Sequence, residues 1–298
     1  MSLLRVQPLT WFERFLINVI KCGPIPKHIA FIMDGNRRFS SKNNIPISEA
    51  HYLGFDKLTE TLQWCSEMGV KEVTVYAFSI GNFKRSKKEV EILMNLAIEK
   101  FHGLLQHEIE LRKRGIHIRI IGNLNLLPDD LQRLMAKLML VTKDNNEVFV
   151  NFACAYTSTD EITTVVENIV EATGNKVITP DCIDENLISK SLYTSEGPDP
   201  DLLIRTSGEL RLSDFLLWQT SSSCIYFTKV LWPELNFWNF LSCILYYQRS
   251  YATIENVKME QKQILTKNCP TNSRQVNTFL NQLEVARQKQ LQSLAGLL

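Results

Sequence analysis

The sequence lacks an excess of charge of either sign. Lysine and arginine number 33 and aspartate and glutamate 32 among 298 residues, which gives a formal net charge of +1. A nearly neutral chain has no broad positive field with which to follow a nucleic-acid backbone. Nucleic acid is therefore not an expected partner, and any site for anions must be built locally.

The sequence also lacks the marks of an exported or membrane-spanning chain. Its seven cysteines are odd in number and form no Cys-x-x-Cys pair, which indicates neither a disulfide framework nor a zinc site. No run approaches the roughly 18 apolar residues of a membrane span, and the start carries no secretory signal pattern. We expect a reduced, cytosol-facing protein that does not cross a membrane.

Familiar nucleotide-binding motifs are missing as well. There is no Gly-x-x-x-x-Gly-Lys-Ser/Thr loop, and no Gly-x-Gly-x-x-Gly motif follows a predicted strand. The motif set of protein kinases is also absent. Nucleotide hydrolysis is therefore a disfavoured function.

The sequence does contain enough apolar material for one large core. Hydrophobic residues make up 45% of the chain, and a chain of this length can bury one such core. We predict an N-terminal amphipathic helix in residues 1–23, one globular domain in residues 24–250 and a helical tail in residues 251–298.

Residues 11–20 carry apolar side chains at helical spacing, with Glu13, Arg14 and Asn18 on the other face. Two roles stay open for this helix. It could lie on a membrane or cover an apolar opening, or it could pack on its own domain.

Short β-rich runs alternate with longer helical runs beyond residue 27. Several of these runs are continuously apolar, which is typical of strands covered by helices on both faces. The pattern predicts an α/β fold with a mainly parallel sheet flanked by helices. The predicted strands are His28–Met33, Glu72–Ser79, Ile116–Ile121, Val148–Cys154, Asp201–Arg205 and Ile225–Thr228.

Two helix starts carry the capping-box pattern, in which a serine is followed three residues later by a glutamate. Ser86 with Glu89 predicts the start of a helix whose apolar stripe runs from 90 to 105. That stripe could be ordinary core or the wall of a lipid tunnel. Ser158 with Glu161 predicts a second helix start.

The last fifty residues are polar, with a break predicted at Asn268-Cys269-Pro270. A modest apolar stripe in this tail could contact another subunit, or the tail could be a solvated appendage. The stripe consists of Val276, Phe279, Leu280 and Leu283.

Polar, arginine-containing segments follow three of the predicted strands. In a parallel α/β sheet, ligands bind beyond the carboxyl ends of the strands. Gly35 allows close backbone approach at a predicted helix start, and guanidinium groups suit phosphate oxygens. Together the segments predict a site for two diphosphates. They are Asp34-Gly35-Asn36-Arg37-Arg38, residues 79–85 and residues 205–213.

Asp34 is the acidic member of the first segment. A carboxylate beside phosphates is repulsive unless a hard cation bridges them, and Mg²⁺ prefers oxygen ligands. We therefore interpret Asp34 as a Mg²⁺ ligand, with a helix N-cap as the alternative. His51, on the next predicted helix, could face the same site or be an ordinary packed histidine.

These segments resemble those of the cis-prenyltransferases, the family of undecaprenyl diphosphate synthase, over residues 10–250. The most similar branch is the eukaryotic one that makes dehydrodolichyl diphosphate. The resemblance is carried by residues 26–38, Tyr76-Ala77-Phe78-Ser79 with Asn82 and Arg85, residues 204–209, Leu216-Leu217-Trp218-Gln219 and Val230-Leu231-Trp232-Pro233-Glu234.

The resemblance implies a six-stranded parallel sheet and a hydrophobic tunnel for a growing polyprenyl chain. It implies a Mg²⁺-dependent enzyme that condenses isopentenyl diphosphate onto farnesyl diphosphate, giving long-chain dehydrodolichyl diphosphate for dolichol synthesis and protein glycosylation. Asp34 would be catalytic and hold the metal, with His51 beside the site. The implied ligands are Gly35, Asn36, Arg37 and Arg38 for the allylic diphosphate, Arg205, Arg211 and Ser213 for isopentenyl diphosphate, and Ser79, Asn82 and Arg85 between them.

Five residues depart from the family pattern and leave an alternative open. A diverged, weakly active or inactive paralogue could keep the fold and bind diphosphates or a partner. A lipid-binding module built on residues 11–20 would explain that helix but not the arginines. The departures are Gly81 for a glutamate, Asn123 for an aspartate, Thr159 for an arginine, and Ile47 and Ala50 where an arginine and a glycine are usual.

The C-terminal region lacks the Arg-x-Gly motif with which self-sufficient family members complete a partner's active site. Residues Arg249-Ser250-Tyr251 do not supply it. The resemblance therefore implies a second subunit similar to the Nogo-B receptor. It also implies peripheral association with the cytosolic face of the endoplasmic reticulum membrane.

Overall fold

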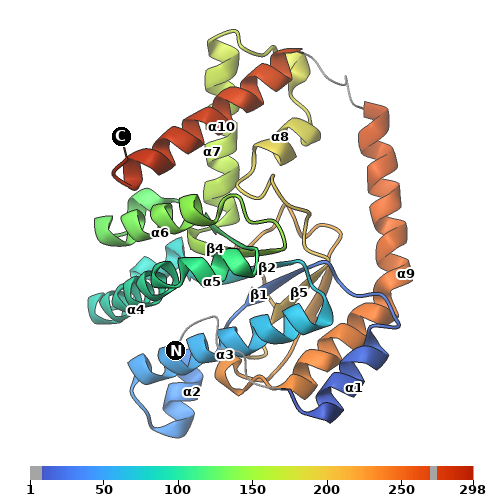
Figure 1. Cartoon of the computed structure of the whole chain (residues 1–298). Coiled ribbons are helices and arrows are strands. Elements are labelled where there is room, and N and C mark those ends of the chain that lie inside the picture. The colour runs from blue at the N-terminus through green and yellow to red at the C-terminus, as the bar shows by residue number, and fades with distance from the viewer. Residues whose placement is uncertain (1–8, 269–273, 298) are drawn as a thin grey trace.

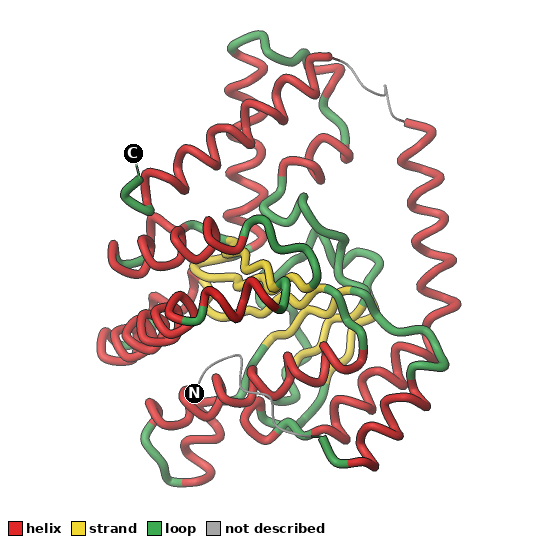
Figure 2. The backbone as a smooth tube through the Cα atoms, viewed as in Figure 1, coloured by secondary structure: helices red, strands yellow, loops and turns green. Residues whose placement is uncertain are grey.

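A single six-stranded sheet forms the centre of the molecule, with helices on both faces (Figures 1 and 2). The computed structural model describes residues 9–268 and 274–297. All strand pairs are parallel, in the order β3-β4-β2-β1-β5-β6. The strands are β1 (His28–Ile32), β2 (Glu72–Ser79), β3 (Ile116–Ile121), β4 (Val148–Tyr156), β5 (Leu202–Arg205) and β6 (Cys224–Phe227).

The predicted fold class is confirmed, and each predicted strand matches an observed one to within two residues at either end. Along the sheet the chain order reverses at β1, which has β2 on one side and β5 on the other. At such a reversal, a crevice for ligands forms beyond the carboxyl ends of the neighbouring strands. The residues that follow β1 and β5 lie at the edge of this crevice.

Ten α-helices are present in the described part of the chain. They are α1 (Trp11–Ile20), α2 (Asn36–Asn43), α3 (Ile47–Met68), α4 (Lys87–Gln106), α5 (Glu108–Lys113), α6 (Asp129–Thr142), α7 (Ser158–Gly174), α8 (Glu185–Ser191), α9 (Phe237–Asn268) and α10 (Arg274–Leu294). Within the described residues, no helix is long and apolar enough to cross a membrane.

The strand alternation divides the core between the two faces of the sheet. Ile29 and Phe31 of β1 join the larger cluster, which contains buried residues of α1, α3, α4, α6 and α9. Ala30 and Ile32 point to the other face and pack with Phe215. Because both faces are covered, β1 is buried along its whole length.

Helix α1 begins at a capping box formed by Thr10 and Glu13. Its inner face packs on the domain, since Ile17 and Ile20 are buried in the main core. The prediction that this helix packs on its own domain is therefore confirmed, but for one face of the helix only. Its outer face stays exposed and apolar, with Trp11, Phe12, Phe15 and Val19.

Helix α4 begins as predicted, because the Ser86 hydroxyl accepts a hydrogen bond from the Glu89 N–H at 3.3 Å. The prediction for α7 is wrong by one residue. Thr157 has the extended backbone of an N-cap and accepts from Asp160 N–H, so Ser158 is the first helical residue. The hydroxyl of Ser158 accepts from Leu217 N–H instead, a tertiary contact that local sequence does not reveal.

Helix α10 lies against α6 and α8, whereas the second half of α9 extends up the opposite side of the molecule (Figure 1). Helix α9 passes through residue 250 without interruption and ends at Asn268, while Cys269 and Pro270 of the predicted break lie outside the described residues. The apolar stripe of α10 packs against α7 and α8, with Phe279 buried beside Val165 and Leu187. The stripe on α10 is therefore neither solvated nor a free subunit-binding surface, because its apolar residues complete a local core.

Candidate active site

The loops after β1 and β5 meet at an ion pair. Ile32 and Arg205 are register partners in the sheet, and Arg205 donates to a carboxylate oxygen of Asp34 at 2.9 Å. The Arg205 side chain is only 3% exposed, whereas Asp34 is a third exposed. Burial disfavours the charged form of Asp34, but the hydrogen bond and charge of Arg205 outweigh it, so the pKa of Asp34 lies below its ordinary value.

The turn after Asp34 requires glycine. Gly35 has a φ of +114°, and a Cβ there would lie 3.1 Å from both Leu231 Cα and Ser207 Cβ. Gly35 is also the N-cap of α2, with no side-chain cap. The N-cap interpretation of Asp34 is therefore wrong, and the amide groups at the start of α2 stay available to an anion.

Arg38 and Glu209 link the first and third arginine segments. Arg38 donates to the carbonyl of Ser207 at 2.7 Å, to its hydroxyl at 2.6 Å and to Glu209 at 3.2 Å. Arg211 also donates to Glu209. Sequence reasoning did not single out Glu209, although its place between Arg205 and Arg211 was the available signal.

The loop that carries Arg211 and Ser213 is anchored by Arg205. One guanidinium nitrogen of Arg205 donates to the Arg211 carbonyl and, at 2.8 Å, to the Ser213 hydroxyl. Ser213, Asp214 and Leu216 all have positive φ. Positive φ at non-glycine residues is strained and persists only where surrounding contacts hold it.

The second arginine segment forms a short 3₁₀ turn, residues Ile80–Lys84. Ser79 and Asn82 cap it reciprocally, with Ser79 N–H donating to Asn82 at 3.0 Å and Gly81 N–H donating to Ser79 at 2.9 Å. Arg85 pairs with Glu89 at 2.8 Å. The structure thus places Ser79, Asn82 and Arg85 together on the wall of one cavity.

The residues that depart from the family pattern make no contact with the Asp34–Arg205 pair in the hydrogen bonds and ion pairs of the described residues. Gly81 is exposed, and Ala50 is buried in α3, which begins at Ile47. Asn123 donates its N–H to the Ala155 carbonyl, and Thr159 N–H donates to Asp214 at 3.0 Å. The Thr159 contact uses only its backbone, whereas the Asn123 side chain also hydrogen-bonds to Asp160.

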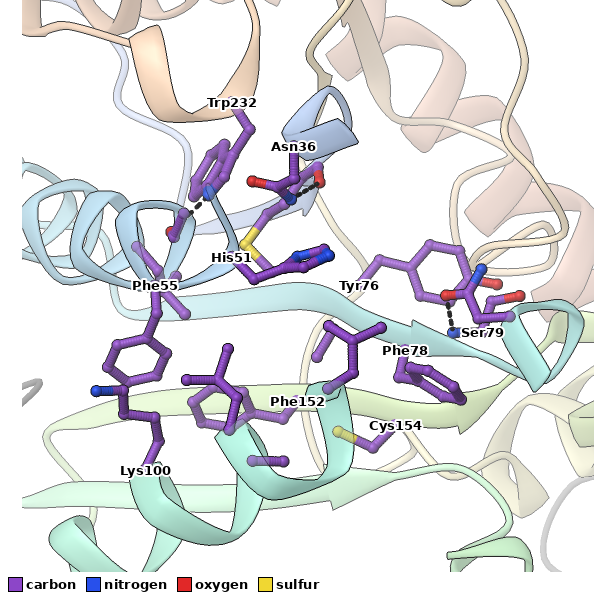
Figure 3. A pocket seen from close by; sticks show the side chains of 18 of the residues that line it. Asn36, His51, Phe55, Tyr76, Phe78, Ser79, Lys100, Phe152, Cys154 and Trp232 are labelled. Atoms are coloured by element: carbon purple, nitrogen blue, oxygen red, sulfur yellow. Dashed lines mark hydrogen bonds between the residues drawn. The ribbon is translucent and has the colours of Figure 1, made fainter. Parts of the chain in front are cut away.

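His51 lies at the centre of the cavity wall beside Asn36 (Figure 3). Its side chain is buried, and its Nε2 has no partner among the described residues. Burial, followed by the positive charge of Arg85, lowers the pKa of His51 to about 4. The imidazole is therefore neutral at physiological pH and has a free nitrogen at the cavity.

This cavity has a polar end and an apolar end. The polar end contains all the predicted site residues except Gly35 and Arg38. The apolar end contains Met94, Phe101, Leu104, Met135 and Phe152, so the predicted stripe of α4 lines a cavity rather than only filling a core. Its volume of about 380 Å³ lies in the range of small-molecule sites.

A second cavity of about 350 Å³ lies towards the amino ends of the strands. Its lining includes Val70, Val73 and Val148. Leu104 and Phe152 line both cavities. A long apolar ligand that passed these two side chains would enter the second cavity.

Five arginines surround the polar end, as the sequence predicted for an anion site, but the chain itself neutralises part of their charge. Asp34, Glu209 and Glu89 form ion pairs with four of them. Arg37 makes no ion pair within the described residues. Positive charge remains in excess, which favours binding of anions such as diphosphates.

The donor set at this site fits a magnesium ion that is shared with a substrate. No group of three or more His, Cys, Asp or Glu side chains in the described part of the chain could hold a metal. Mg²⁺ is commonly bound by one or two carboxylates together with substrate phosphates and water. Asp34, a partly exposed carboxylate on the cavity wall, can supply that single protein ligand.

The fold and this site define a class of protein. A cationic crevice at the reversal point of a parallel α/β sheet opens into an apolar cavity, which suits ligands that combine a phosphate head with a hydrocarbon tail. A family model described as "Putative undecaprenyl diphosphate synthase" matches residues 32–254. The chain belongs to this family, the cis-prenyltransferases.

Relatives of known function support the same conclusion. The chain is 51% identical over 258 residues to the human dehydrodolichyl diphosphate synthase complex subunit, covering 87% of this chain and 78% of that protein. It is 42% identical to a tritrans,polycis-undecaprenyl-diphosphate synthase of Thermococcus kodakarensis, covering 80% of this chain and 90% of the relative.

A solved structure shares the fold. Lavandulyl diphosphate synthase from Lavandula x intermedia, in complex with dimethylallyl diphosphate, superposes with a TM-score of 0.71 at 30% sequence identity. The match covers 75% of this chain and 95% of the lavender enzyme.

Proposed function

We propose that this protein is the catalytic subunit of a dehydrodolichyl diphosphate synthase and condenses isopentenyl diphosphate onto farnesyl diphosphate to supply dolichol synthesis. The observation that carries the proposal is the Asp34–Arg205 pair where the cationic crevice opens into the apolar cavity. The names of the human and archaeal relatives support prenyl chain elongation as the reaction.

In this proposal the allylic diphosphate binds at the start of α2. The donors at this point are the amides beyond Gly35, the Asn36 side chain and the guanidiniums of Arg37 and Arg38. Departure of the diphosphate leaves a carbocation-like allylic carbon and builds negative charge on the leaving group. Fixed cationic donors aimed at that charge lower the barrier.

Isopentenyl diphosphate binds between Arg205, Arg211 and Ser213 in the same scheme. Arg205 is held by Asp34 and by the loop that it anchors, so its guanidinium is fixed before substrate arrives. The double bond of isopentenyl diphosphate then attacks the allylic carbon. A proton leaves the new chain, and the released diphosphate is an oxygen base that can receive it.

Asp34 would hold Mg²⁺ together with diphosphate oxygens. The bound ion would supply charge neutralisation at the leaving group. The carboxylate is suited to this role because its lowered pKa keeps it ionised at neutral pH.

The hydrocarbon chain occupies the apolar end of the cavity as it grows. Phe101 and Phe152 pack edge to face there, with ring centroids 5.3 Å apart. Apolar walls exclude water from the allylic carbon, which protects a carbocation-like centre from hydrolysis.

A second subunit and a membrane are part of the proposal. The word "complex" in the relatives' names supports a partner, and the missing C-terminal Arg-x-Gly motif favours a Nogo-B receptor-like subunit. The exposed face of α1, with Phe12 packed beside Trp238 at 6.1 Å, suits peripheral contact with the cytosolic face of the endoplasmic reticulum membrane.

One assay tests the reaction directly. The full chain, alone and with the partner subunit, is incubated with farnesyl diphosphate, labelled isopentenyl diphosphate and Mg²⁺. We expect labelled long-chain polyprenyl diphosphate in the presence of the partner. Absence of labelled product under both conditions would overturn the enzyme assignment and revive the inactive-paralogue alternative, which the relatives do not favour.

The membrane part of the proposal has its own test. Flotation of the full chain with vesicles of endoplasmic reticulum lipids should fall for Phe15→Glu, because a charge on the exposed face of α1 opposes insertion. Val257→Glu, at a partly exposed position on α9, is the matched control. Equal flotation of the parent and both variants would remove α1 from membrane binding.

A further inference from the structure

Helix α3 carries a glycine where it meets the start of α2. A Cβ built on Gly54 would lie 2.5 Å from Asn36 Oδ1 and 3.3 Å from Trp232 Cδ1. All three residues line the main cavity. Glycine inside a helix weakens it relative to alanine, so α3 itself gains nothing from Gly54. The close approach of Asn36 and Trp232 is what requires the glycine.

The Asn36 amide is oriented by its contact with Gly54. Its Oδ1 is buried against that glycine and has no hydrogen-bond partner among the described residues. Its Nδ2 donates one long hydrogen bond, of 3.5 Å, to the Met33 carbonyl. Hydrogen bonds therefore do little to hold this side chain, which rests on the surface of α3 instead. With the oxygen turned towards α3, the N–H donors are left for an anion, and a diphosphate needs that end of the amide.

Trp232 fixes α3 at the same point. Its indole N–H donates to the Gly54 carbonyl through a buried hydrogen bond of 2.7 Å, and the residue is 1% exposed. A carbonyl inside a helix already accepts from the N–H four residues later, so this bond is an additional tie between two elements. The ring also packs beside Phe31 of β1, with centroids 6.0 Å apart. Helix α3 cannot slide or rotate at Gly54 without breaking the indole bond.

The backbone around Trp232 connects this tie to the turn after β1. Trp232 N–H donates to the Asp34 carbonyl at 3.0 Å. Leu231 lies against Gly35, since a Cβ on that glycine would be 3.0 Å from Leu231 Cδ2. Residues 231–232 therefore join the turn that begins α2 to the middle of α3.

His51 depends on the same placement of α3. It precedes Gly54 by three residues, so the two lie on one face of the helix. Its Nε2 is buried without a partner among the described residues, and it lies with Asn36 and Trp232 on the cavity wall (Figure 3). A shift of α3 would displace the imidazole and release the Asn36 amide together.

We propose that Gly54 and Trp232 are positioning residues for the allylic diphosphate. They hold α3 against the start of α2, so that the donor end of Asn36 and the His51 imidazole face the same ligand. The inference rests on the proposed function, because it takes an allylic diphosphate as the ligand of Asn36. The ligands proposed for isopentenyl diphosphate follow β5 and share no hydrogen bond with Gly54 or Trp232 in the described part of the chain.

The first test is Gly54→Ala in the full chain with its partner subunit. The added methyl group must displace Asn36 Oδ1, and we expect KM for farnesyl diphosphate to rise about tenfold, as for loss of a hydrogen bond to a charged group. KM for isopentenyl diphosphate should stay within about twofold of the parent. Gly103→Ala is the matched control inside α4, because its Cβ meets no atom within 4 Å, and it should leave every constant at the parental value.

A double-mutant cycle with Asn36→Ala separates positioning from a general loss of packing. If Gly54 acts through the Asn36 amide, Gly54→Ala should change KM for farnesyl diphosphate by less than about twofold once that amide is gone. A structural role independent of Asn36 predicts the same fold change in both backgrounds, because independent effects add in free energy. Equal fold changes would therefore overturn the inference.

The third test is Trp232→Phe, which keeps an aromatic ring but removes the indole donor to the Gly54 carbonyl. KM for farnesyl diphosphate should rise several-fold, because α3 loses the bond that fixes it. Trp64→Phe makes the same change on α3 within the core, where Trp64 packs against Phe237 and Phe240. Both variants should lose stability, but only Trp232→Phe should lose affinity for farnesyl diphosphate.

Calorimetry of farnesyl diphosphate binding, without isopentenyl diphosphate, distinguishes failure of this inference from failure of the proposed function. If the parent makes no product, the proposed function fails, and the binding comparison still decides the inference because it needs no turnover. If Gly54→Ala and Trp232→Phe bind farnesyl diphosphate like their matched controls, the positioning inference fails. Equal rises in both KM values also contradict it. Should Trp232→Phe not fold, Gly54→Ala decides the outcome, since alanine is the better helix former.

Discussion

The polar and apolar ends of the main cavity are stabilised by different forces. At the polar end, Arg205 is fixed by Asp34 and Ser213 through directional hydrogen bonds. At the apolar end, Phe101, Leu104 and Phe152 are held by close packing in the main core. Substitutions at the polar end should therefore change turnover with little effect on stability, and substitutions at the apolar end should do the reverse.

The largest expected effect is at the apolar end. Phe152→Ala should reduce the free energy of unfolding by about 3–5 kcal/mol, because it removes a buried aromatic ring and enlarges an existing void. Denaturant unfolding measures the loss, and calorimetry should show isopentenyl diphosphate affinity close to the parent. A stability loss below about 1 kcal/mol, within the range of surface substitutions and their errors, would show that the ring is not packed as described.

The polar end is tested by Asp34→Asn. Removing the carboxylate should reduce kcat by about 10²–10³-fold, as for loss of one electrostatic group in an active site. The melting temperature should change little, since the amide oxygen can still accept from Arg205. Lys42→Ala, which removes an exposed ion pair with Glu234, is the control, and parental turnover in Asp34→Asn would refute the metal-ligand role.

His51 lies between the two ends, and its protonation makes the stability of the protein depend on pH. Its pKa is about 4 in the folded protein and about 6.5 when unfolded, so the unfolded state binds the proton more readily between these values. The pKa difference leaves the free energy of unfolding unchanged above pH 6.5. As pH falls towards 4, it lowers the free energy of unfolding by up to about 3 kcal/mol. His51→Gln should flatten the pH dependence of unfolding in this window relative to the parent protein. An unchanged slope in His51→Gln would contradict the buried neutral state.

The smallest expected effect concerns the departures from the family pattern. Gly81→Glu restores the usual acidic residue at an exposed position whose added Cβ would meet only the Ser79 hydroxyl, at 3.2 Å. Turnover should stay within about twofold of the parent, as for a surface substitution. An increase of tenfold or more in steady-state turnover would show that Gly81 weakens the polar end and would favour the diverged-paralogue interpretation.

Sequence reasoning predicted the strands well because each is a short β-rich run between longer helical runs, and several are continuously apolar. It also selected the segments after β1, β2 and β5, because arginines follow all three strands and guanidinium groups suit phosphate oxygens. It erred at Ser158, where Thr157 provides the cap, and at the tail, where Phe279 joins a local core. Both errors arise from tertiary contacts that a local pattern cannot contain.

The sequence by itself determined the α/β class, the glycine turn at Gly35 and the arginine-rich segments that we propose bind diphosphates, because these depend on residue type and local order. Only the tertiary structure decided that Arg205 pairs with Asp34, that Glu209 joins two guanidiniums and that His51 is left with a free nitrogen. The physical reason is distance along the chain. Contacts between residues more than a hundred positions apart are set by strand order and packing, which no single segment encodes.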